Sequence, residues 1–344
     1  MLHWLDKNFL WHNKALSLIG SMLFVFNTSY AQELHFSQNQ AVPLYANPAL
    51  TGVFNGLFRL SGVWRYQWFN LVPYHTASLG IDFNLNRVGI GVWFYRDVMG
   101  DVNMGFTNMQ LSLSYLHIPS RNQKNALIAG ISFAYTYIGL DVASVVLPEE
   151  WDPIAKTFNR PPLEVIDDQR GFFRMHVGVA YTTEIHDGFK LLFGGSINNA
   201  YSGNASLLNK EIYKFPIRYG FHAYGEILTW RGDWTFLPSV WLWYQPPHIQ
   251  VVAGTFLRRT RIRDYHYGVR RLPVFLDFGL FFRTSAELVP VVRVIIGDLQ
   301  LGFSFDFPVS AISRTTRYLG GPEITLILIR GNKPGPGKLP CPDT

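Results

Sequence analysis

The sequence predicts an all-β protein: a single transmembrane antiparallel β-barrel of the outer-membrane type, with about fourteen strands and a short N-terminal plug-like segment. Three observations indicate this fold. Hydrophobic and polar residues alternate along many segments, aromatic residues reach 16% while charged residues stay at 16%, and the chain begins like a secreted protein. Beyond that beginning, no apolar run approaches the roughly 18 residues that a spanning helix needs.

Residues 1–31 are interpreted as a signal peptide. Lys7 and Lys14 accompany an apolar run of about a dozen residues, ALSLIGSMLFVF, which is typical of a signal-peptide core. The following SYA resembles a cleavage site, so cleavage after Ala31 is expected to leave Gln32 as the new N-terminus. A retained membrane anchor is the alternative. The remaining chain is divided into an N-terminal loop or plug segment (32–56), the barrel (57–330) and a periplasmic Pro-rich tail (331–344).

Period-two alternation is the signal that distinguishes strands from helices here. In ASLGIDFNL, Leu79, Ile81 and Phe83 share one face, while Ser78 and Asp82 share the other. A helix would scatter these polar residues around its axis. We expect strands to begin near residues 57, 76, 87, 104, 125, 171, 189, 217, 234, 248, 266, 287, 298 and 321. The strand that starts near residue 266 is expected to be broken by Pro273.

The polar face of these strands carries charged residues and a histidine, which a membrane barrel directs into its lumen. The residues concerned are Arg59, Arg65, Asp82, Arg96, Arg174, His176, Arg218, Glu226, Asp277, Arg293, Asp306 and Glu323. A soluble β-sandwich would instead direct them to water, and alternation alone does not separate the two folds. Among the candidate lumenal residues, Asp82 and Glu226 are expected to pair with Arg65 or Arg218.

A long acidic connection lies between residues 139 and 170. With both termini periplasmic, it follows an odd-numbered strand and is expected to lie outside the cell. Its candidate partner-binding residues are Glu149, Glu150, Asp152, Asp167 and Asp168. The adjacent pairs Glu149 with Glu150 and Asp167 with Asp168 could also bind Ca²⁺ through oxygen. The alternative is a solvated acidic loop, because the spaced ligands of an EF-hand are missing.

Composition and motifs exclude several classes of function. The formal charge of +6 is modest, and no basic patch with interleaved aromatics indicates nucleic-acid binding. Cys341 is the single cysteine, so an intramolecular disulfide is impossible. We find no metal-binding histidine motif and no nucleophile elbow. We therefore expect no catalytic site, no metal and no cofactor.

The segment before the first predicted strand combines turn-forming and flexible residues. Asn47-Pro48 favours a turn, Pro48 cannot donate to a ladder, and Gly52 permits a bend. Inside a barrel this segment would need polar partners, which Arg59, Arg65 and Gln67 could supply. A flexible linker is the alternative.

The same stretch, FSQNQAVPLYANPALTG, together with RYQW and the ending CP, resembles the PorP/SprF family of type IX secretion system membrane proteins. The motif positions are Phe36, Ser37, Gln38, Asn47, Pro48, Ala49, Gly52, Arg65, Gln67, Trp68, Cys341 and Pro342. The resemblance implies a non-enzymatic outer-membrane component that supports export or surface anchoring of cargo proteins such as gliding adhesins. It also implies other type IX components as partners. The alternative from barrel physics is a channel or transporter for small or hydrophobic solutes.

Overall fold

The computed structural model describes residues 34–68, 72–100, 103–119, 124–141, 151–152, 157–158, 167–186, 188–208, 211–229, 234–261, 274–309 and 320–331. Predicted residues outside these ranges include the signal peptide, Glu149, Glu150, Cys341 and Pro342. The described helices are short: η1 (Asn39–Ala41), α2 (Pro43–Ala46) and η2 (Pro48–Leu50). No helix in the described part of the chain is long and apolar enough to cross a membrane.

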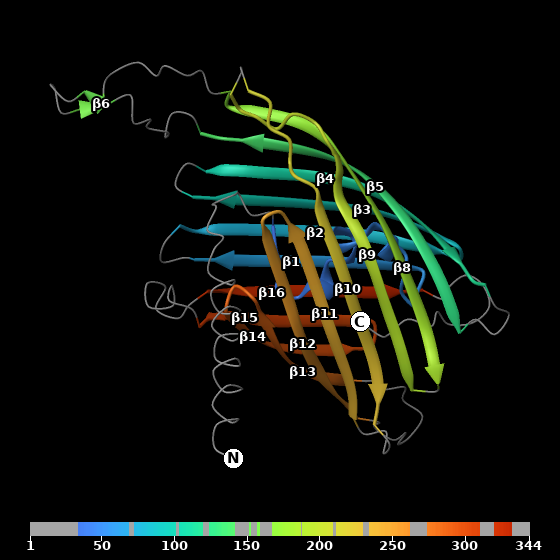
Figure 1. Cartoon of the computed structure of the whole chain (residues 1–344). Helices are drawn as coiled ribbons and strands as arrows, with labels where there is room; N and C mark the ends of the chain where they lie inside the picture. The colour runs from blue at the N-terminus through green and yellow to red at the C-terminus, as the bar shows by residue number, and fades with distance from the viewer. Residues whose placement is uncertain are drawn as a thin grey trace, which may run out of the picture. The chain divides into compact units, whose positions relative to one another are not determined.

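Fourteen of the described strands form one closed antiparallel barrel, in which each strand pairs with its neighbours along the chain and β1 pairs with β16 (Figure 1). The barrel strands are β1 (Phe58–Gln67), β2 (Tyr74–Leu85), β3 (Val88–Met99), β4 (Met104–His117), β5 (Asn125–Gly139), β8 (Gln169–His186), β9 (Phe189–Ser202), β10 (Arg218–Leu228), β11 (Trp234–Gln245), β12 (His248–Arg261), β13 (Val274–Arg283), β14 (Glu287–Ile296), β15 (Leu299–Pro308) and β16 (Gly321–Arg330). This confirms the predicted fold class.

The predicted strand start near residue 266 lies outside the described residues. The described part of β13 begins at Val274, directly after Pro273. In addition, β6 (Trp151–Asp152) and β7 (Thr157–Phe158) form a separate two-stranded antiparallel sheet within the long acidic connection.

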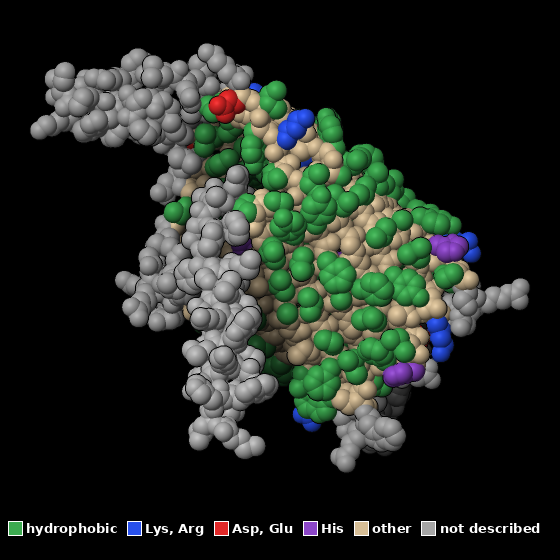
Figure 2. Space-filling model, in the orientation of Figure 1, with side chains coloured by type: hydrophobic (Ala, Val, Ile, Leu, Met, Phe, Trp, Pro, Cys, Tyr) green, Lys and Arg blue, Asp and Glu red, His purple; other side chains and the backbone are tan. Residues whose placement is uncertain are grey.

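Alternation places apolar side chains on the outside and polar side chains in the lumen. In β2, Leu79 is 54% exposed on the outer face, whereas Asp82 is fully buried on the inner face. Figure 2 shows hydrophobic side chains spread over the strands of one face, with charged side chains and histidines toward its edges. Such an outer surface matches the hydrocarbon region of a bilayer, and a closed barrel leaves no strand edge unpaired within it.

Arg96 is a correction to the predicted lumenal set. It is exposed on the outer face of β3, because its neighbours Tyr95 and Asp97 are the residues that point inward. Arg96 lies three residues before Met99, the last residue of the strand. A long basic side chain near a strand end can extend its charge to the membrane interface, which explains why this position tolerates arginine.

The hydrophobic core lies inside the barrel, where the N-terminal segment packs on the inner wall. Ala46 and Leu50 belong to one buried cluster with Ile128, Leu192 and Trp241, which come from β5, β9 and β11. The barrel is therefore filled by its own N-terminal residues together with inward-pointing side chains. This arrangement fixes the position of the segment that forms the candidate site.

The outer face generates a first prediction, which compares two apolar residues at different depths. Phe303 lies in the middle of β15 and Leu85 at the end of β2, and both are exposed on the outer face. We expect Phe303→Arg to lower the free energy of unfolding in lipid vesicles by about 2–4 kcal/mol, and Leu85→Arg by about 0–1 kcal/mol, because a charge costs most at the bilayer midplane. Urea titration followed by tryptophan fluorescence measures both. Equal losses for the two variants would contradict the assignment of the lipid-facing surface.

Candidate functional site

The segment 35–56, here called the plug, lies within the barrel and is bound to opposite parts of its wall. Its helices place Leu44, Ala46, Ala49 and Leu50 in buried positions. Backbone carbonyls of the plug accept hydrogen bonds from wall side chains, including Gln110 Nε2 to Leu44 O at 2.9 Å. Buried backbone groups need such partners, and the inward polar residues of the strands supply them.

Asn47 fixes the middle of the plug to β8 and β9. Its Oδ1 accepts a hydrogen bond from Ala49 N–H at 2.9 Å, which caps η2 before Pro48. Its Nδ2 donates to Val179 O and Gly195 O, both at 3.1 Å. The side chain therefore both closes a turn of the plug and ties that turn to two barrel strands.

Gly52 fixes the end of the plug beside β1 and β2. It has φ of +72°, and its N–H donates to Asp82 Oδ2 at 2.7 Å. A Cβ at this position would lie 2.7 Å from the Cα of Gly89, so a side chain is excluded by both conformation and space. Arg59 Nη2 completes the junction, because it donates to Leu50 O at 3.2 Å and to Asp82 Oδ2 at 2.7 Å.

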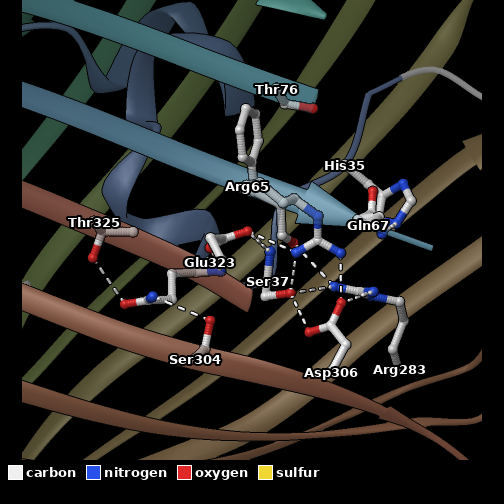
Figure 3. Close-up of polar contacts among 12 residues, drawn as sticks. His35, Ser37, Arg65, Gln67, Thr76, Arg283, Ser304, Asp306, Glu323 and Thr325 are labelled. Carbon is white, nitrogen blue, oxygen red and sulfur yellow. Dashed lines mark hydrogen bonds and ion pairs between the residues drawn. The ribbon is translucent and has the colours of Figure 1, made fainter. Parts of the chain in front are cut away.

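The first residues of the plug, His35–Gln38, are here called the arm, and they bind a carboxylate of β16 through their backbone (Figure 3). Ser37 N–H donates to Glu323 Oε2 and Gln38 N–H donates to Glu323 Oε1, each at 2.7 Å. The Ser37 hydroxyl donates to Asp306 Oδ1 at 2.5 Å and accepts from Arg65 Nη1. Arg283 Nη2 also donates to the Ser37 hydroxyl at 3.0 Å, so one residue contacts four charged side chains of the wall.

Five charged side chains from five strands surround the arm. Arg65 of β1 pairs with Asp306 of β15 at 2.5 Å and with Glu323 of β16 at 2.7 Å. Arg283 of β13 pairs with Asp306 at 3.2 Å and also with Glu287 of β14. Two arginines face three carboxylates, which leaves a formal charge of −1 on this group. We call these five residues the charge cluster.

Side chains at the edge of the charge cluster hold the remaining polar groups of the arm. Gln38 Nε2 donates to Ser304 Oγ at 3.2 Å, and Thr325 Oγ1 donates to Gln38 Oε1 at 3.0 Å. The Nε2 atoms of Gln67 and His35 lie 3.3 Å apart. Although His35 keeps some accessible surface, burial of its ring, followed by the charges of Arg283 and Arg65, lowers the pKa of His35 well below its usual range.

Tyr45 joins the arm to tryptophan side chains of β3 and β11. Its ring packs edge-on against Phe36 at 5.5 Å between centroids and lies 5.1 Å from Trp93. Arg218 donates from Nη1 to the Tyr45 hydroxyl at 2.6 Å and lies 4.2 Å from the centre of the Trp243 ring. The predicted lumenal Arg218 therefore binds the plug through a hydrogen bond and cation–π contacts.

The predicted pairing of the lumenal carboxylates is wrong. Asp82 pairs with Arg59 at 2.7 Å, and Glu226 pairs with Lys190 at 3.1 Å, rather than with Arg65 or Arg218. Both pairs are direct cross-strand partners in their ladders. Alternation had identified the correct face but not the register, and the register decides which charges meet.

A second buried group lies on β12, β13 and β14, and of its members only Asp277 and Arg293 were predicted as part of the polar face. Asp277 accepts from Arg258 Nε at 2.9 Å and from Arg293 Nη2 at 2.8 Å. Both arginines are the direct cross-strand partners of Asp277. Register analysis of the tight β13–β14 hairpin could have found Asp277 with Arg293 and Arg283 with Glu287.

Two of the predicted partner-loop residues are described with side chains. Asp167 pairs with Arg170 at 2.6 Å, and Asp168 is exposed. Asp152 lies in β6. No group of three or more His, Cys, Asp or Glu residues in the described ranges is placed to hold a metal ion.

Trp68, the last residue of the RYQW motif, lies directly after β1. It donates its N–H to Gly320 O at 2.9 Å, and its ring packs edge-on against Tyr74.

The structure thus gives the N-terminal motif a common location: Phe36, Ser37, Gln38, Asn47 and Gly52 all bind the inner wall. The profile of the type IX secretion system membrane protein PorP/SprF family matches residues 28–325. The chain belongs to the PorP/SprF family. This confirms the resemblance seen in the motifs. A closed barrel with an apolar outer face, in a family of secretion-system membrane proteins, is a protein of the outer membrane.

No curated protein sequence was found to match the chain. Three solved barrels are similar in structure at low identity. The TodX deltaS2S3 mutant monoaromatic hydrocarbon channel has 8% identity and a TM-score of 0.48, covering 85% of this chain and 94% of that chain. The CymD monoaromatic hydrocarbon channel has 11% identity and a TM-score of 0.44, with the same coverage of 85% and 94%. The P. putida toluene transporter TodX has 8% identity and a TM-score of 0.43, covering 82% and 91%.

The charge cluster generates a second prediction. Arg65 is fully buried between two carboxylates, whereas the Lys190–Glu226 pair keeps 23% and 17% of its side-chain surfaces exposed. We expect Arg65→Ala to lower the free energy of unfolding by about 3–5 kcal/mol, because it removes the ion pair of buried Glu323 and one of the two ion pairs of buried Asp306. Lys190→Ala is the control and should cost less than about 1 kcal/mol. Urea titration in lipid vesicles measures both, and a tolerated Arg65→Ala would show that the cluster is solvated.

Proposed function

We propose that this barrel is a non-enzymatic component of the type IX secretion system that supports export or surface anchoring of cargo proteins, such as gliding adhesins. The observation that carries the proposal is the plug, which crosses the lumen and is bound to strands on several sides of the wall. Glu323 holds its beginning, Asn47 its middle and Asp82 its end. A barrel filled in this way is suited to holding a protein partner rather than to free diffusion of solutes.

The side-chain contacts of the plug are distributed over several strands of the wall. Thr51 Oγ1 lies 2.7 Å from Ser112 Oγ of β4, Ser196 Oγ of β9 donates to Ala46 O at 3.0 Å, and Gln40 Nε2 donates to Ser239 Oγ of β11 at 2.9 Å. A porin needs a continuous wet channel between such walls. The plug places backbone and apolar side chains where that channel would run.

The charged groups of the lumen support a structural role rather than catalysis. Asp82, Asp277, Asp306 and Glu323 each accept hydrogen bonds from arginine at 2.5–3.2 Å. A general acid or base must be free to exchange its proton with a substrate, whereas arginine side chains already occupy the oxygens of these carboxylates. We therefore propose partners rather than substrates: other type IX components and the exported proteins.

A third prediction tests the function in cells and in bilayers. We expect a strain without this gene to lose a set of surface proteins, measured by protease shaving of intact cells and mass spectrometry, and to regain them with the wild-type gene. The purified mature protein should show no steady conductance in planar bilayers, because the plug fills the lumen. If the protein is instead a channel, the surface proteome should be unchanged in the deletion strain and the purified protein should conduct steadily. That combination of results would overturn the proposal.

A fourth prediction tests the orientation that a partner-binding loop requires. A cysteine at Ser144, in a Cys341→Ser background, should react with a membrane-impermeant maleimide on whole cells, because the acidic connection follows an odd-numbered strand. The same cysteine should react to the same extent after lysis. Labelling that appears only after lysis would place the loop on the periplasmic side and remove it as an outer partner surface.

A further inference from the structure

The arm is bound in the way a peptide ligand is bound, and its pocket is built almost entirely by the barrel wall. The groups that hold Ser37 and Gln38 come from β1, β13, β15 and β16. The rest of the plug supplies Tyr45, which packs on the Phe36 ring. The polar half of this pocket is therefore a property of the wall and does not depend on the arm.

The pocket binds both the backbone N–H groups and a backbone carbonyl of the arm. Glu323 accepts the consecutive N–H groups of Ser37 and Gln38, and Arg283 Nη2 donates to Phe36 O at 3.3 Å. These contacts require a peptide of defined chain direction but no particular side chain. They are the sequence-independent part of recognition, like the main-chain bonds in other peptide-binding sites.

Side-chain contacts add specificity at three successive positions. Phe36 is 1% exposed, Ser37 contacts Arg65, Arg283 and Asp306 through its hydroxyl, and Gln38 exchanges hydrogen bonds with Ser304 and Thr325. Gly302 leaves room for the Gln38 amide. A Cβ at Gly302 would lie 2.3 Å from Gln38 Oε1. The pocket thus selects an aromatic residue, a hydroxyl residue and an amide residue in that order.

The wall groups are not satisfied without the arm. Glu323 would lose two of its three hydrogen-bond donors, and Asp306 would lose the Ser37 hydroxyl. Even with the arm in place, Nε of Arg65 and Nε of Arg283 are buried and have no hydrogen-bond partner among the described residues. Buried polar groups without partners are costly, so an empty pocket favours binding of a peptide that restores them.

We propose that the charge cluster, with Ser304, Thr325 and Gly302, is a peptide-binding site for an extended segment carrying an aromatic, a hydroxyl and an amide residue in succession. The chain's own Phe36–Gln38 occupies it as an intramolecular ligand. Because the predicted cleavage after Ala31 leaves a free end a few residues away, the arm can leave the site without any chain having to thread through the barrel. The site accepts a segment of the same chemistry in trans when the arm is weakened. This inference does not depend on the secretion role.

The test uses the full mature chain and a fluorescein-labelled peptide with the sequence of residues 32–40. The variant Phe36→Ala/Ser37→Pro weakens only the arm, because proline removes the N–H and the hydroxyl that bind Glu323 and Asp306. We expect the labelled peptide to bind this variant, measured by fluorescence anisotropy in detergent. The wild type should bind it at least 100-fold more weakly, because its tethered arm competes at a millimolar effective concentration.

Three controls make the result specific to this pocket. Gln40→Ala removes a plug contact to Ser239 outside the pocket and should behave like the wild type. A peptide with alanine in place of Ser37 should bind about tenfold or more weakly, because it loses hydrogen bonds to charged groups. Glu323→Gln, added to the arm variant, should weaken the labelled peptide similarly.

Several outcomes would overturn the proposal. A folded arm variant that does not bind the peptide shows that the arm is a structural element rather than a ligand. Equal binding of the native peptide and the peptide with alanine in place of Ser37, or equal binding by wild type and variant, places the interaction elsewhere. If the double variant does not fold, Phe36→Ala alone gives the same test at higher peptide concentration, because it keeps every hydrogen-bonding group of the arm. Failure of that variant to bind counts equally against the proposal.

Discussion

The ion pairs inside this barrel are the interaction on which the rest of the structure depends. A membrane barrel must turn its polar face inward, and a charge that is buried there without a partner is costly. Arg59 with Asp82, Arg258 and Arg293 with Asp277, and the charge cluster meet this requirement in three places. Two of these places, Asp82 and the charge cluster, also bind the plug. The same charges therefore stabilise the wall and locate the segment that fills it.

The sequence predicts the faces of the strands well because a side chain's face depends only on local alternation. Leu79 and Asp82 lie on the predicted outer and inner faces, and most strand starts agree to within a few residues. Arg96 is an exception because a strand end near the interface accepts a charge on either face.

The partners of the lumenal charges were harder to predict because they depend on register and on barrel closure. Arg59 and Asp82 are opposite each other across a hairpin, so their contact follows once that hairpin's register is known. Arg65 and Glu323 are 258 residues apart and become opposite each other only because β1 pairs with β16. No local pattern contains that information. The N-terminal motif was easier to place, since Asn47-Pro48 and Gly52 form turns for local reasons.

Barrel closure and plug binding are thermodynamically coupled through the same residues. The charge cluster contains Arg65 from β1 and Glu323 from β16, so the pocket for Ser37 is complete only when these two strands are paired. Any interaction made by the closed barrel alone shifts the equilibrium toward closure. The arm makes such interactions, because its hydrogen bonds extend across the seam between the first and last strands. The first residues of the plug therefore stabilise the contact between the two ends of the sheet, which explains why so polar a segment is held so deeply inside a membrane protein.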